Sequence, residues 1–130
     1  MIGYQVDAGK GWWGKLYDES RRRKVIGKSD DAEAVNRAVK QDGWNDYRIR
    51  AEGTRIRPWI NGLAAPDFTA TESTIPQDGQ IGLQLHGNRQ TVAQVKALTT
   101  ETFPPTTNPT PAAKAALPPG QTNKGGQRPG

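Results

Sequence analysis

Hydrophobic and polar residues alternate along much of the first hundred residues, and this alternation predicts short β-strands. The clearest case is the segment 80–87. One face of this strand would be apolar, formed by Ile81, Leu83 and Leu85. The other would be polar, formed by Gly82, Gln84 and His86. Such a strand is typical of the floor of a polar binding cleft, and equally of a half-exposed strand in a sandwich.

The same period predicts further strands over residues 2–6, 12–17, 44–51 and 54–60. Asn61-Gly62 is a strong hairpin signal, because both residues tolerate the positive φ of a type I′ turn. Pro58 has no amide to donate to a sheet, so we expect it at an edge or a bulge. Apolar residues recur again over 92–98.

One helix is predicted over residues 29–41. Asp30 and Glu33 form a capping box at its start, and Gly43 ends it. Its apolar stripe of alanines and valines is narrow. We therefore expect a surface helix in a connection, outside the core.

Many short strands with Asn-Gly and Asp-Gly turns favour an all-β protein, an antiparallel sandwich or jelly roll. From residue 104 to 130 the chain is rich in Pro, Thr and Gly, and Leu117 is its one large apolar residue. Such a stretch cannot bury enough apolar surface to offset its ordering entropy. We expect a folded part over 1–103 and a disordered tail over 104–130.

Charge and composition exclude several classes of protein. The net charge of +5 is concentrated in a run at 21–24 and in a second arginine cluster at 48–57. Neighbouring acids favour a solvated or internal salt-bridge role over nucleic-acid binding. The absence of cysteine and the single histidine exclude disulfides, thiolate metal sites and multi-histidine sites. No run of the sequence is apolar enough to span a membrane, and the first residues do not resemble a signal peptide.

Five segments carry a resemblance to a known family: 3–7 (GYQVD), 14–23 (GKLYDESRRR), 44–49 (WNDYRI), 60–62 (ING) and 79–87 (GQIGLQLHG). In this order and spacing they resemble the 3-keto-disaccharide hydrolase domain family. The resemblance implies a concanavalin-like β-sandwich. It covers the C-terminal two-thirds of that domain, so we expect an N-terminally truncated sandwich. It also implies a periplasmic or secreted full-length parent.

The activity that the resemblance implies is cleavage of a glycosidic bond in a sugar oxidised at carbon 3. The ketone acidifies the proton on carbon 2, so a base can remove it and the aglycone can leave from carbon 1. Such a route needs a base, an enolate stabiliser and a leaving-group acid. The alternatives are a lectin-like carbohydrate-binding module and an inactive fragment. No cofactor is required, although Asp7 or Asp18 would suit a divalent cation such as calcium.

Candidate site residues lie at like-facing strand positions. His86 is the first choice for the base, because histidine titrates near neutral pH. Asp7 and Glu19 would orient it, hold a cation or act as the base, unless Glu19 simply pairs with Arg21. Trp12 or Trp13 would stack on a sugar ring, although tryptophans in small sandwiches are most often core. The expected substrate-binding residues are Gln5, Tyr17, Arg21, Gln84 and Trp13.

Overall fold

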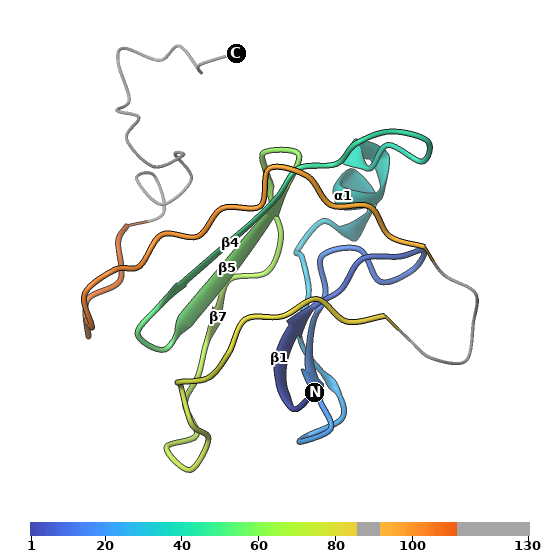
Figure 1. Ribbon diagram of the computed structural model, residues 1–130. Coiled ribbons are helices and arrows are strands. Elements are labelled where there is room, and N and C mark those ends of the chain that lie inside the picture. The colour runs from blue at the N-terminus through green and yellow to red at the C-terminus, as the bar shows by residue number, and fades with distance from the viewer. Residues whose placement is uncertain (86–91, 112–130) are drawn as a thin grey trace.

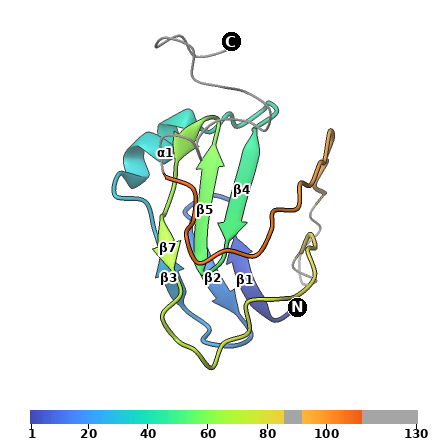
Figure 2. The same cartoon turned by 90° about the vertical axis from the view of Figure 1, so that its left-hand side faces the viewer.

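The computed structural model describes residues 1–85 and 92–111. Its strands form two antiparallel sheets. The first contains β1 (Gly3–Val6), β2 (Leu16–Glu19) and β3 (Val25–Gly27), and the second contains β4 (Tyr47–Glu52), β5 (Arg55–Ile60), β6 (Leu63–Ala64) and β7 (Phe68–Thr69). The sheets lie in two layers, with the first behind the second in Figure 2. The predicted all-β class, an antiparallel sandwich with one short helix, is confirmed.

The second sheet is built on tight hairpins. Asn61 and Gly62 join β5 to β6 with φ values of 50° and 78°, as the type I′ turn requires. Pro58 lies between the part of β5 that pairs with β6 and the part that pairs with β7. This position suits a residue that has no amide to donate.

The core lies between the sheets and under the helix α1 (Ala32–Ala38), which covers one end of both layers (Figure 1). Val35 and Val39 form a buried cluster with Ile60 of β5. The helix lies on the surface as predicted, since Val35 is its one buried residue, but the prediction that it lies outside the core is wrong. Two valines on a narrow stripe suffice, because β5 presents an apolar residue directly to them. The helix is also shorter than predicted, since Asp31 caps it by accepting a hydrogen bond from the Ala34 amide at 2.9 Å.

The layers approach closely at Gly14. Its φ is 72°, and a Cβ atom there would lie 3.0 Å from the Ile60 side chain and 3.1 Å from that of Ala65. Glycine therefore brings the 9–15 loop against the core. On the inner face of the first sheet, Tyr4 meets Phe68 of β7 at 6.0 Å between ring centroids.

The predicted strand over 80–87 is a second correction. In its described part, residues 80–85, the chain is irregular, and Ile81, Leu83 and Leu85 are 88%, 69% and 56% exposed. The physical reason is the absence of a partner, because no strand of the described residues pairs with this segment. Residues 92–98 are likewise irregular and expose their apolar side chains.

Residues 101–111 run across the face of β4 and β5 that points away from the first sheet (Figures 1 and 2). We call this segment the strap. Thr110 of the strap donates from its amide to Glu52 at 3.0 Å. The domain boundary after residue 103 stays a prediction, and most of the predicted tail lies outside the described residues. No helix in the described ranges has the length and apolarity needed to cross a membrane.

Candidate functional site

The outer face of the first sheet brings together several of the predicted site residues. Gln5 of β1 lies directly opposite Tyr17 of β2. Leu16 and Asp18, the alternate residues of β2, are fully buried on the inner face. Because side chains alternate along a strand, Lys15, Tyr17 and Glu19 lie on the outer face with Gln5.

Asp7 follows β1, and three hydrogen bonds to its backbone groups hold it in place. Its carbonyl oxygen accepts hydrogen bonds from the Tyr47 hydroxyl at 2.6 Å and from the Gly14 amide at 3.0 Å. Its amide donates to the Lys15 carbonyl at 2.9 Å. The Gln5 Nε2 group donates to the Asp7 carboxylate, and the Gln5 Oε1 atom is buried without a hydrogen-bond partner in the described structure. Gln5 and Asp7 thus form a positioned amide–carboxylate pair.

An aromatic pair lies beside this amide–carboxylate pair. Trp12 and Tyr17 meet edge to face at 6.1 Å between centroids, and Trp12 is 46% exposed. The Lys15 ammonium lies 5.0 Å from the centre of the Trp12 ring. Trp13 instead packs against the buried cluster and against Tyr47, with centroids 6.3 Å apart. The structure therefore places Trp12, rather than Trp13, where a sugar ring can stack.

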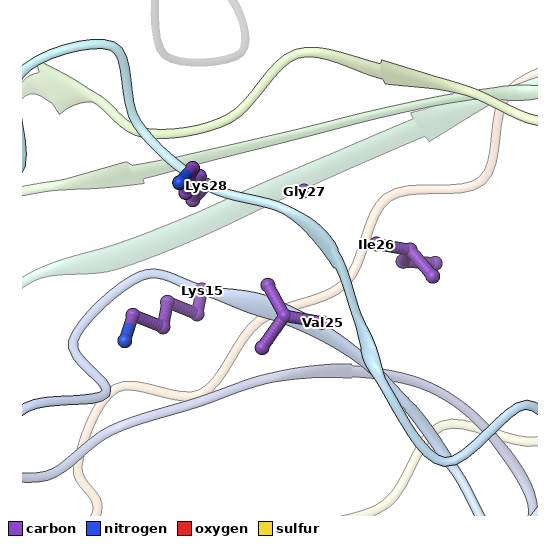
Figure 3. Close-up of a pocket in the computed structure, with 5 residues that line it drawn as sticks. All are labelled: Lys15, Val25, Ile26, Gly27 and Lys28. Carbon is purple, nitrogen blue, oxygen red and sulfur yellow. The ribbon is translucent and has the colours of Figure 1, made fainter.

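A hollow adjoins this face. It is lined by Lys15, by Lys28 and by the three residues of β3, as Figure 3 shows. Val25 of β3 lies opposite Tyr17, so the hollow continues the surface formed by the aromatic pair. The two lysines give the hollow a positive charge, which favours a ligand group that carries or develops negative charge.

Other predicted residues lie apart from this cluster. Glu19 lies at the far end of β2, opposite Gly3, and its carboxylate accepts a hydrogen bond from the Ser20 hydroxyl at 3.0 Å. The chain then turns at Ser20, whose φ is 54°. The row of outward side chains ends there, and Arg21 turns inward. Its Nη2 atom lies 2.7 Å from the Asp18 carboxylate, so Arg21 pairs with Asp18 and not with Glu19.

The buried Asp18 side chain is the centre of an internal ion-pair cluster. Burial alone would raise the pKa of Asp18, but hydrogen bonds from Arg21 and Arg22 outweigh it, and the net pKa is lowered. This bears out the internal salt-bridge role expected for part of the 21–24 run. Two arginines already occupy Asp18, one of the two carboxylates expected to suit calcium, and the described residues contain no cluster of three metal-ligating side chains.

The remaining predicted residues belong to the segment after Gly79. Gln84 is exposed in irregular chain, and nothing in the described structure joins it to Gln5 or Tyr17. His86 lies outside the described residues. Lys15 was not among the predicted site residues, although its period-two spacing from Tyr17 and Glu19 places it on their face.

Comparison with known proteins agrees with the resemblance found in the sequence. The model of a family described as 3-keto-alpha-glucoside-1,2-lyase-like domain matches residues 1–99. No curated protein and no solved structure matches the chain.

Proposed function

Because the chain belongs to the 3-keto-alpha-glucoside-1,2-lyase-like domain family, we propose that it binds a 3-keto-glycoside on the outer face of β1 and β2 and cleaves it by elimination. One observation carries the proposal. The Gln5–Asp7 pair, which holds a positioned carboxylate, lies beside the exposed Trp12 and the half-buried Tyr17. An aromatic face next to convergent polar groups suits a sugar, whose ring has apolar faces and a polar rim.

In the proposed reaction, Asp7 is the base. Its carboxylate takes the proton from carbon 2, and the electron pair of that bond forms an enolate with the neighbouring ketone. When the ketone re-forms, the bond from carbon 1 to the aglycone oxygen breaks and leaves a double bond between carbons 1 and 2. The departing oxygen takes a proton from solvent, and Asp7 returns the abstracted proton to solvent. Water then adds to the enone, its hydroxyl group to carbon 1 and its proton to carbon 2, which completes a net hydrolysis.

The other groups bind and stabilise. Lys15 supplies positive charge for the enolate oxygen, since its ammonium group lies on the same face and lines the hollow. The Gln5 amide positions the Asp7 carboxylate through the hydrogen bond from its Nε2 atom. Trp12 packs against the ring. The scheme uses no cofactor, so EDTA and added calcium are both expected to leave the rate unchanged.

A carbohydrate-binding module without turnover is the second candidate, and one observation favours it. Arg21, the residue expected to stabilise an enolate, is held by the buried Asp18 and does not reach the outer face. Binding would then use the same aromatic and amide groups. Substrate and product assays separate the two functions.

The test uses the whole chain with a methyl 3-keto-α-glucoside. Exchange of the carbon 2 proton into deuterium oxide, followed by NMR, reports the first step, and release of methanol reports cleavage. The Asp7→Asn variant is expected to slow both by at least about 100-fold while binding persists. Asp42→Asn, an exposed aspartate outside the site, is the matched control.

The possible results separate the candidates. Loss of exchange in His86→Ala with full activity in Asp7→Asn would overturn the role of Asp7. Saturable binding of the keto sugar with neither exchange nor cleavage would replace the enzyme with the binding module. If Trp12→Ala bound the keto sugar as tightly as the wild type, the proposed binding surface would be wrong.

A further inference from the structure

A second polar cluster lies on the opposite side of the molecule, on the outer face of β4 and β5. In the sheet register, Arg48 lies opposite Trp59, Arg50 opposite Arg57, and Glu52 opposite Arg55. These six side chains share one face of the sheet. Arg57 and Glu52 are only 3% and 6% exposed, so this arginine-rich face is covered.

Positive charge exceeds negative charge in this cluster. Glu52 holds two guanidinium groups, those of Arg50 at 2.8 Å and Arg57 at 2.9 Å. Arg48 has no ion pair within the described ranges, and its guanidinium lies 5.1 Å from the centre of the Trp59 ring. Because Arg55 pairs with Asp67, the charges of the other three arginines are opposed in the cluster by the single carboxylate of Glu52.

Three guanidinium nitrogens of the cluster are buried without a hydrogen-bond partner in the described structure. They are Nη1 of Arg48, Nε of Arg50 and Nε of Arg57. Buried donors of this kind are rare in folded proteins, because each costs the free energy of its lost hydration. Burial, followed by the charges of Arg50 and Arg57, also lowers the pKa of Arg48, against the opposing effect of Glu101. The cluster thus has guanidinium donors free for a further acceptor beyond Glu52.

From these observations we infer that the outer face of β4 and β5 binds an oxyanion of a small ligand, a carboxylate or a phosphate group. Planar guanidinium groups pair with both kinds of anion through two parallel hydrogen bonds. The low exposure of Arg57 disfavours an extended polyanion, because only a small group could reach a guanidinium that the strap covers. This site is independent of the proposed sugar-cleaving face, which belongs to the other sheet.

The strap covers this site (Figure 2), and Thr110 supplies uncharged hydrogen-bond acceptors to Arg50 and Arg57. The carbonyl oxygen of Thr110 accepts a hydrogen bond from Arg57 at 2.7 Å. The ring of Phe103 lies 4.4 Å from the Arg50 guanidinium, and the charge of Glu101 acts on Arg48. An incoming oxyanion therefore competes with the strap, in which Glu101 is the one charged residue.

The test is isothermal titration calorimetry of the full chain at constant ionic strength. Glucuronate offers a carboxylate, glucose 6-phosphate offers a phosphate, and glucose is the neutral control. We expect saturable binding of one or both anions and none of glucose at this site. The two anion arms identify which source the site accepts. Arg48→Gln is expected to weaken anion binding by about tenfold or more.

Arg55→Gln is the matched control, since it removes the same charge from the same face. Arg55 is already engaged by Asp67, with Nε to Oδ1 at 2.8 Å, so its loss is expected to change affinity less than about twofold. Equal loss in the two arginine variants would mean a diffuse charge effect and would overturn the site.

Glu101→Gln keeps the test decisive if Arg48→Gln fails to fold, which a thermal melt reports. Removal of the competing carboxylate is expected to tighten anion binding by about threefold or more. An unchanged affinity in this variant, or no saturable anion binding in it and in the wild type, would overturn the proposal. None of these readouts depends on glycoside cleavage, so the proposed enzyme activity and this site fail separately.

Discussion

Strand β5 and the segment 80–85 have similar patterns of apolar and polar residues in the sequence, but β5 is buried in the structure and the segment 80–85 is exposed. Both largely alternate polar and apolar residues over six positions. In β5 every residue after Arg55 is buried, whichever face it occupies. In the segment 80–85 the apolar residues are exposed, and Ile81 is 88% accessible.

The difference lies in the neighbours. β5 pairs with β4 along one edge and with β6 and β7 along the other. The first sheet and α1 cover its inner face, and the strap covers its outer face. The segment 80–85 has no such partner among the described residues. Alternation therefore predicts which residues share a face, whereas burial is set by what lies against that face.

The largest expected effect comes from the buried end of β5. Ile60→Ala is expected to lower the free energy of unfolding by about 4 kcal/mol, because it leaves a cavity beside Val35 and Val39. Leu83→Ala removes a side chain of the same size from the exposed segment and is expected to change stability by less than about 0.5 kcal/mol. Urea unfolding measures both. Equal losses would mean that the segment 80–85 is buried in solution.

The next effect tests the polar face of β5. Glu52→Gln leaves the guanidinium groups of Arg50 and Arg57 without their carboxylate, and is expected to lower the free energy of unfolding by about 3 kcal/mol. Glu33→Gln is the control, since that residue pairs only with Arg37 in an exposed position, at 3.7 Å. A loss no larger than that of the control would show that the buried cluster contributes nothing to stability.

The same carboxylate gives a pH dependence with a definite sign. Hydrogen bonding from Arg50, together with Thr110, lowers the pKa of Glu52 from 4.5 to about 2, against the effect of burial. A lowered pKa means that the folded state favours the charged form, so its stabilisation is present above pH 4.5 and is lost as the pH falls toward 2. The difference between wild type and Glu52→Gln should shrink over this window in acid titrations of stability. A constant difference would contradict the assignment.

These effects separate what the sequence could predict from what it could not. The Asn61-Gly62 turn and the faces of β1, β2, β4 and β5 follow from local chemistry and from the period of the sequence. The placement of Gln5 and Tyr17 on polar strand faces could therefore be predicted. The position of the strap could not be predicted, because its proline- and threonine-rich sequence has no hydrophobic period and its contacts are long-range.

Two site residues show the same limit. Arg21 does not share the face of Tyr17 and Glu19, because Ser20 has a positive φ that ends the strand. The alternating pattern does not predict such an angle at a residue other than glycine. Trp12 and Trp13 are adjacent and chemically identical. Only the position of the buried cluster, formed by α1 and β5, decides that Trp13 belongs to the core and Trp12 to the outer face. Local pattern thus defines faces, and long-range packing selects among them.

The smallest expected effect concerns the contact that joins the second sheet to the proposed sugar site. The Tyr47 hydroxyl donates to the Asp7 carbonyl at 2.6 Å and accepts from the Gly14 amide at 3.3 Å. Tyr47→Phe is expected to lower the free energy of unfolding by about 1.5 kcal/mol. Tyr4→Phe is the control, because its hydroxyl meets only the exposed Gln77 amide, at 3.1 Å.

The Tyr47 hydroxyl also has an alkaline signature. Burial, with the charge of Asp7, raises the pKa of Tyr47 from 10.0 to about 12, against the hydrogen bond from Gly14. A raised pKa means that the folded state favours the neutral phenol, so its contribution is complete below pH 10 and is lost as the pH rises through 12. Tyr47→Phe should therefore flatten the alkaline loss of stability that the wild type shows. If Tyr4→Phe flattened it equally, the anchoring of Asp7 by Tyr47 would be refuted, and with it the rigidity that the proposed base requires.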